Sequence, residues 1–92
     1  QPRIVRVNKV YVEARPEGFL VFIKNNDVPG VVGTVGTVLA QDNVNIAGIT
    51  FGREVSGGLA VSVVNVDNEV SQLTIEKIQK AKDILFVKLL KV

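Results

Sequence analysis

The sequence predicts an α+β fold with its elements in the order strand, helix, strand, strand, helix, strand. Three observations indicate this order: an apolar run at residues 19–23, two segments with apolar residues at helical spacing, and a glycine-rich turn at residues 56–58 between two further apolar runs. The order is that of the ferredoxin-like split βαβ arrangement, a sandwich in which both helices cover one face of an antiparallel sheet.

The first strand and helix meet at a proline. The strand is the run Phe19–Ile23, and Pro29 forbids a continuing ladder because proline has no amide hydrogen. Proline suits the first turn of a helix, so we expect the helix to begin at Pro29 with Asp27 as its cap. Gly33 and Gly36 indicate either tight packing on the sheet or close approach of another backbone. The expected buried stripe is Val31, Val32, Val35, Val38 and Leu39.

The middle of the chain reads as a β-hairpin. Its strands are expected at Val44–Arg53 and Leu59–Val66, on either side of the turn at residues 56–58. Gly48 and Gly52 predict a bulge or another close contact in the first of these strands.

The C-terminal part reads as a second helix and a last strand. We expect the helix to run from Glu69 or Ser71 to Ala81, and the strand to cover Ile84–Lys91. The expected buried face of this helix is Val70, Leu73, Thr74, Ile78 and Ala81.

The strand at residues 19–23 is apolar on both faces, so both faces of the sheet need a cover. The helices cover one face. The other must meet a second copy, a neighbouring domain or the N-terminal segment. Arg3–Val7 and Val10–Glu13 read as a short hairpin, and we interpret residues 1–17 as the last strands of a preceding domain or as a linker. Residues 18–92 are then the α+β domain.

The composition excludes many functions. The 92 residues include no histidine and no cysteine, so no catalytic residues, cofactor site or metal site of the usual kinds are expected. The net charge of +2 comes from scattered residues, which argues against a nucleic-acid partner. No apolar run reaches the roughly 20 residues of a membrane span, and no signal peptide opens the chain, so we expect no membrane partner and a cytoplasmic location. The start at Gln1 indicates a piece of a longer protein.

The densest cluster of polar and turn residues is the loop at residues 25–30, which leads into the first helix. Unpaired amides at a helix N-terminus favour a carboxylate, and Asp27 with the side-chain carbonyls of Asn25 and Asn45 could accept from an ammonium group. A zwitterionic amino acid would meet both of its charges there. The alternative is that Asp27 only caps the helix and the asparagines form turns. The glycines at residues 30, 33 and 36 lack the spacing of a phosphate-binding loop.

Two adjacent motifs resemble a known family. The segment Asn-Asp-Val-Pro-Gly-Val-Val-Gly at residues 26–33, followed by Val-Asn-Ile-Ala at residues 44–47, resembles the signature of ACT domains. The likeness is greatest to the C-terminal regulatory domains of D-3-phosphoglycerate dehydrogenases, and it extends from Phe19 to the end of the chain. Residues 3–18 resemble the last strands of the intervening domain in the long forms of those enzymes.

The resemblance implies a regulatory function. It implies that paired copies join edge to edge into one sheet, as a homodimer or a larger assembly, and bind an amino-acid effector, L-serine, between them. The catalytic domains of the parent enzyme would be partners, and NAD would bind there and not to this chain. The ligand residues carried over are Asn25, Asp27, Gly30, Val31 and Asn45.

Two positions depart from serine-regulated members, which often have a histidine at the position of Asn25 and an arginine at that of Val28. Two alternatives therefore stay open. The chain resembles, in the same loop, the β subunit of iron–sulfur L-serine dehydratases. It would also suit a purely structural oligomerisation module.

Overall fold

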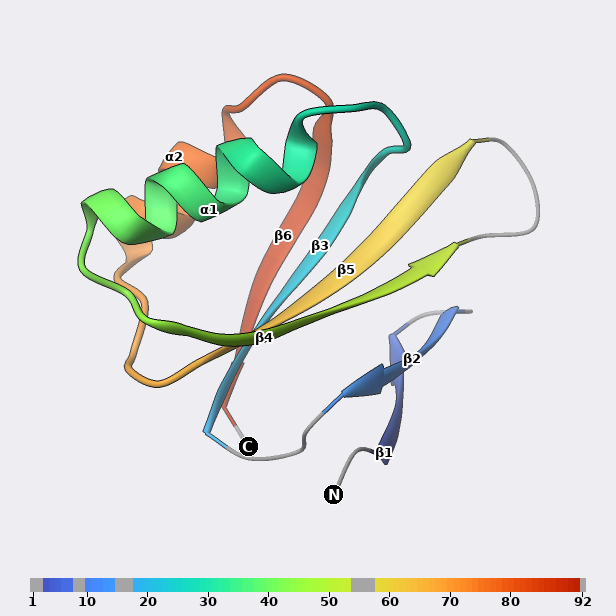
Figure 1. The fold of residues 1–92 in the computed structure, drawn as a ribbon, viewed down its shortest axis with the longest axis horizontal. Coiled ribbons are helices and arrows are strands. Elements are labelled where there is room, and N and C mark those ends of the chain that lie inside the picture. The colour runs from blue at the N-terminus through green and yellow to red at the C-terminus, as the bar shows by residue number, and fades with distance from the viewer. Residues whose placement is uncertain (1–2, 8–9, 15–17, 54–57, 92) are drawn as a thin grey trace.

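A computed structural model describes residues 3–7, 10–14, 18–53 and 58–91. A four-stranded antiparallel sheet has the strand order β4-β5-β3-β6, and both helices lie on one face of it (Figure 1). This confirms the predicted fold class. The elements are β1 (Arg3–Val7), β2 (Val10–Ala14), β3 (Phe19–Asn26), α1 (Val31–Gln41), β4 (Ile46–Arg53), β5 (Leu59–Val66), α2 (Gln72–Gln79) and β6 (Ile84–Lys91). Of the helices in the described part of the chain, neither is long and apolar enough to cross a bilayer.

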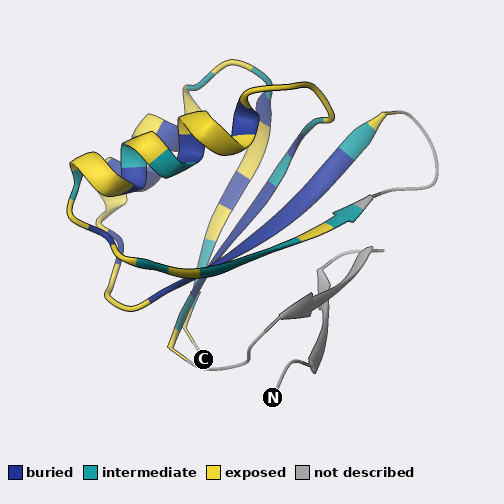
Figure 2. Cartoon of the chain, viewed as in Figure 1, coloured by how far each residue is buried: buried dark blue, intermediate teal, exposed yellow. Residues whose placement is uncertain are grey.

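The main core lies between the helices and the sheet. Alternate residues of the central strand β3, such as Val21 and Ile23, point into it and meet Leu39 of α1 and Ile78 of α2. All four are essentially inaccessible to solvent, whereas the outer faces of both helices are exposed (Figure 2). The positions of both helices on the sheet therefore follow from this apolar contact.

The second face of the sheet has a smaller core of its own, made of Leu20, Phe22, Val61 and Val63. β1 and β2 form a separate antiparallel hairpin, and β2 packs against β4 and β5 without joining their sheet. The N-terminal segment thus supplies a cover for this face, one of the three expected occupants. The separate sheet is compatible with the predicted boundary at residue 17, which stays a prediction.

The start of α1 differs from the prediction. The helix begins at Val31, not at Pro29, and its N-cap is Gly30, with a φ of 93° and no side-chain cap, so the assignment of Asp27 as the cap is wrong. Val32 is 44% exposed and lies outside the buried stripe. A Cβ at Gly33 or Gly36 would meet no atom within 4 Å, so tight packing of these glycines on the sheet is also wrong.

The start of α2 agrees better with its sequence pattern. Ser71 is the N-cap and Thr74 is buried, as expected. Leu73 is 64% exposed and Ile75 takes its place in the core, because the helix is rotated so that Thr74, Ile75 and Ile78 face the sheet. The bulge predicted in β4 lies between Ile46 and Gly48.

Candidate functional site

The loop at residues 25–30 is held between two distant parts of the chain. The Asp27 amide donates to the Gly58 carbonyl at 2.9 Å, which places the loop beside the turn between β4 and β5. The Asn26 amide donates to the Asp83 carbonyl at 2.9 Å, and its side chain donates to the Asp83 carboxylate at 3.1 Å. The loop therefore has a defined shape while Asp27, Val28 and the two residues after them remain exposed.

The first turn of α1 presents amides without partners from a cap. The first helical hydrogen bond runs from the Thr34 amide to the Gly30 carbonyl at 3.0 Å, so the amides of Val31, Val32 and Gly33 precede the bonded part of the helix. The N-cap residue Gly30 has no side chain to cap them, and no acidic residue lies in the first turn. This end of the helix therefore carries a partial positive charge that favours a carboxylate.

Asn25 lies at the end of β3 and is only 5% exposed. Its side-chain amide donates to the Asn26 carbonyl at 2.8 Å. Its Oδ1 is buried and has no hydrogen-bond partner among the described residues. An unsatisfied buried acceptor costs about 1–3 kcal/mol, so this oxygen is a strong site for an added donor.

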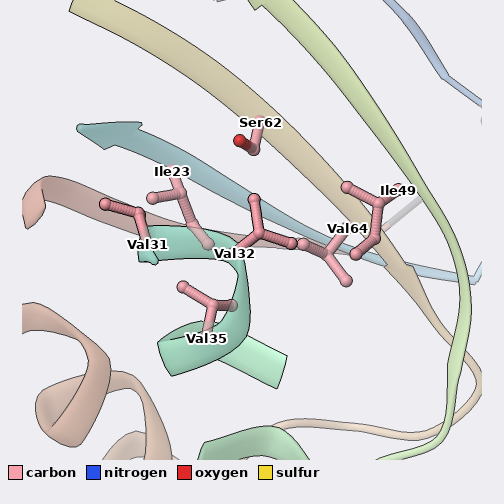
Figure 3. A pocket seen from close by; sticks show the side chains of 7 residues that line it. All are labelled: Ile23, Val31, Val32, Val35, Ile49, Ser62 and Val64. Carbon is pink, nitrogen blue, oxygen red and sulfur yellow. The ribbon is translucent and has the colours of Figure 1, made fainter. Parts of the chain in front are cut away.

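A small hollow lies beside the first turn of α1 (Figure 3). It offers about 10 Å³, roughly the space of one water molecule, and is open on one side. Its lining is apolar except for the hydroxyl of one serine; the residues are Ile23, Val31, Val32, Val35, Ile49, Ser62 and Val64. Ser62 is not among the residues predicted from the sequence, although a serine in a mostly apolar strand was a signal for it.

Asn45 lies at the opposite end of the sheet. The register pairs Val66 with both Ile46 and Phe19, so Asn45 is level with the start of β3 and Asn25 is near its end. Six residues of a strand span about 20 Å. The Asn45 side chain donates to the Asp67 carboxylate, and its backbone amide to the Asn68 side chain at 3.3 Å.

The structure thus brings together four of the five predicted ligand residues. Asn25, Asp27, Gly30 and Val31 surround one helix end, and Asn45 is apart from them within one copy of the chain. Among the described residues, no group of three or more acidic side chains is placed to hold a metal ion. The chemistry available at this end of the sheet is therefore recognition of a small polar ligand by amides, an amide oxygen and a carboxylate.

Comparison with known proteins decides the family. The model of the ACT domain matches residues 19–83, which include the whole loop, both helices and the strands β3, β4 and β5. The chain belongs to the ACT domain family. The resemblance of the two sequence motifs is therefore confirmed.

The relatives of this ACT domain include D-3-phosphoglycerate dehydrogenases. The chain is 34% identical over 88 residues to that of Bacillus subtilis, covering 96% of the chain and 17% of the relative. It is 38% identical over 84 residues to that of Methanocaldococcus jannaschii, covering 91% and 16%. The ACT domain thus spans less than a fifth of the length of these relatives.

A solved structure supports the same family. The acetolactate synthase small subunit from Thermotoga maritima superposes with a TM-score of 0.61 and 28% identity, over 79% of this chain and 47% of that one. The ACT fold is therefore shared with a subunit whose parent enzyme differs from the dehydrogenases.

Proposed function

We propose that this ACT domain is an allosteric amino-acid sensor and that its effector is L-serine. The observation that carries the proposal is a buried acceptor without a described partner close in the chain to a helix start whose N-cap is a glycine. The first turn of α1, with Gly30 as its N-cap, suits a carboxylate, and the buried Oδ1 of Asn25, with the Asp27 carboxylate two residues on, suits an ammonium group. A ligand with both groups on one carbon matches them.

The position of Asn45 fits a site shared by two copies. Asn45 precedes β4, and the loop at residues 27–30 lies beside the turn that follows β4. Antiparallel pairing of β4 with the same strand of a second copy would bring the start of one β4 to the end of the other. The partner subunit's Asn45 would then approach the loop, and the effector would lie between two protomers.

The relatives support the dehydrogenase as the parent over the iron–sulfur dehydratase. We propose that catalytic domains containing the NAD site are joined to this ACT domain in one cytoplasmic enzyme of serine synthesis. Effector binding would stabilise one placement of the paired domains, and the catalytic domains would respond to it. The residues encoded upstream test this part: a dinucleotide-binding GxGxxG segment after a strand supports it, and its absence favours the dehydratase.

Titration calorimetry tests the sensing itself. We expect heat of binding with L-serine and none with D-serine, which has the same charges in the wrong arrangement. Glycine, L-alanine and L-valine complete the panel and report the side-chain preference. No heat with any amino acid, for a folded and paired chain, would favour the purely structural module.

Two variants test the proposed ligand residues. Asn25→Ala removes the buried acceptor, so we expect weaker binding with unchanged or higher thermal stability in the absence of ligand. If Asn25 has only a structural role, Asn25→Ala should lower the thermal stability and leave the binding affinity unchanged. Asn45→Ala should weaken binding by about 1–3 kcal/mol, and unchanged affinity would remove Asn45 from the site. Thr37→Ala, on the exposed face of α1, is the control.

A further inference from the structure

The two edges of the sheet differ in how their backbone groups are satisfied. The outer edge of β6 is contacted by Gln79, the last residue of α2. The Gln79 side-chain Nε2 donates to the Leu85 carbonyl at 3.3 Å, and its Oε1 accepts from the Val87 amide at 3.1 Å. Since β3 pairs with the inner side of β6, these bonds occupy groups that a further strand would use.

This pair of bonds reproduces the pairing of a parallel strand. In a parallel ladder, the amide and carbonyl of one residue bond to residues i and i+2 of the neighbouring strand. The Gln79 carboxamide does the same with Leu85 and Val87. A side chain therefore takes the place of one residue of a neighbouring strand.

Other features also discourage pairing along β6. The register with β3 shifts between Lys24 and Asn25, so the strand is irregular next to the Gln79 contact. Two lysines, Lys88 and Lys91, are exposed along the strand. Bulges and lysines are common devices that protect sheet edges from association.

The other edge strand, β4, has no lysine, and β2 packs against β4 and β5 without joining their sheet. The sequence of β4, Ile-Ala-Gly-Ile-Thr-Phe-Gly-Arg, has no proline and no charge before Arg53. β4 is an edge strand of its sheet, since β5 is the one strand paired with it in the described part of the chain. Phe51 on this strand is 57% exposed, and Val32 nearby on α1 is 44% exposed. An edge of this kind favours pairing with another strand.

We propose that the Gln79 carboxamide acts as a strand stop, so that copies of this chain pair through the β4 edge alone and the assembly ends at two. One open edge per chain gives a twofold interface that uses the same surface on both copies and closes. Two open edges would allow an open-ended sheet. The inference rests on the β4 pairing of the proposed function and adds the role of Gln79, and it does not require that any amino acid binds.

The test compares the mass in solution of three forms by size exclusion with light scattering over a wide concentration range. We expect the wild type at about 20 kDa, twice the 9.9 kDa of one chain. Gln79→Ala should form species larger than two chains, in amounts that rise with concentration. Gln72→Ala, at the other end of α2 and also exposed, should match the wild type.

Hydrogen exchange of the Val87 amide provides an independent readout. It should be slow in the wild type and in Gln72→Ala, and faster in Gln79→Ala at low concentration, because the Oε1 acceptor is gone. Phe51→Lys places a charge on the β4 edge and should give a monomer, whereas the same change added to Gln79→Ala should restore association through β6.

Three results would overturn the proposal. One is a Gln79→Ala variant with fast Val87 exchange and unchanged mass, because the edge would then be open without consequence. Another is a wild type that is monomeric, or larger than two chains, throughout the range. The third is a Phe51→Lys variant that still pairs. Failure of calorimetry with amino acids would leave all three measurements unaffected.

Discussion

The N-terminal ends of the two helices are capped differently. At α2, the Ser71 hydroxyl accepts from the Thr74 amide at 3.2 Å, and the Thr74 hydroxyl donates to the Asp42 carboxylate. At α1, the N-cap is Gly30, which makes no side-chain cap bond. The comparison indicates that this chain caps one helix end with a side chain of its own and places a glycine, which cannot cap, at the other.

The N-terminal end of α2, which we call the closed end because Ser71 caps it, also joins the two helices. Asp42 follows the last residue of α1, and the Lys77 ammonium lies 3.0 Å from its carboxylate. Thr74 and Lys77 therefore tie the start of α2 to the end of α1. These side-chain bonds lie at the end of α1 and the start of α2, whereas the start of α1, which we call the open end because its N-cap is a glycine, follows the loop and lines the hollow.

The largest expected effect is at the closed end. Thr74 is 1% exposed, so Thr74→Val buries the same shape without the hydroxyl and leaves the Asp42 carboxylate without that donor. We expect a loss of about 1–3 kcal/mol in the free energy of unfolding, measured by urea denaturation. Thr37→Val, whose hydroxyl bonds only to the Gly33 carbonyl on the exposed face of α1, is the control. An equal loss of unfolding free energy in Thr74→Val and Thr37→Val would show that the buried hydroxyl contributes no more than the exposed one.

Glycine substitutions at the open end should change stability with opposite signs. Gly30 has a φ of 93°, so Gly30→Ala should cost about 1–2 kcal/mol. Gly33 lies in the helix with open space around its Cβ position, so Gly33→Ala should stabilise the isolated chain by about 0.5–1 kcal/mol. Thermal unfolding checks both. If Gly30→Ala were neutral, the open end of α1 would not depend on its left-handed cap.

A smaller loss is expected from removal of the cap of α2. Ser71→Ala leaves the Thr74 amide without its acceptor and should cost about 1 kcal/mol by chemical denaturation. Ser71→Asn should recover most of the loss, since asparagine caps equally well. A full-size loss that asparagine does not recover would show that Ser71 acts through something other than the cap.

The smallest effect is a dependence on pH. The pKa of the Asp42 carboxyl is lowered from its ordinary 3.8, mainly by the hydrogen bond from Thr74 and next by Lys77. A lowered pKa means stabilisation that is present above the unfolded value and is lost as the pH falls through the folded value. Between about pH 5 and pH 2 the wild type should therefore lose more stability than Asp42→Asn. Parallel stability curves for the two proteins would contradict this role.

The two helix ends also differ in how well the sequence predicted them. Ser71 is a good N-cap residue and it is the N-cap, because hydroxyl capping depends on neighbours a few residues away. Pro29 and Asp27 form an equally regular local signal, yet the helix begins two residues later. The loop is held by Gly58 and Asp83, which are distant in the sequence, and these contacts override the local preference.

The burial of residues on the two helices is also predicted only in part by local sequence patterns. The 3.6-residue period correctly predicted Val31, Val35 and Leu39 on α1, but it placed Val32 and Leu73 in the core and omitted Ile75. Periodicity gives the direction of a stripe only within about one residue, and the rotation of each helix is set by the sheet beneath it.

The amino-acid sequence by itself determined the order of the elements, the two-faced apolar strand at residues 19–23, the turn-rich loop and the absence of histidine and cysteine. These depend on local backbone chemistry and on composition. Only the tertiary structure decided that Gly30 is the N-cap of α1, that Asn25 buries an oxygen without a described partner, that Asn45 lies about 20 Å away in the same copy, and that Gln79 bonds to Leu85 and Val87 of β6. Each of these depends on groups far apart in the sequence, whose distances are set by packing and strand register.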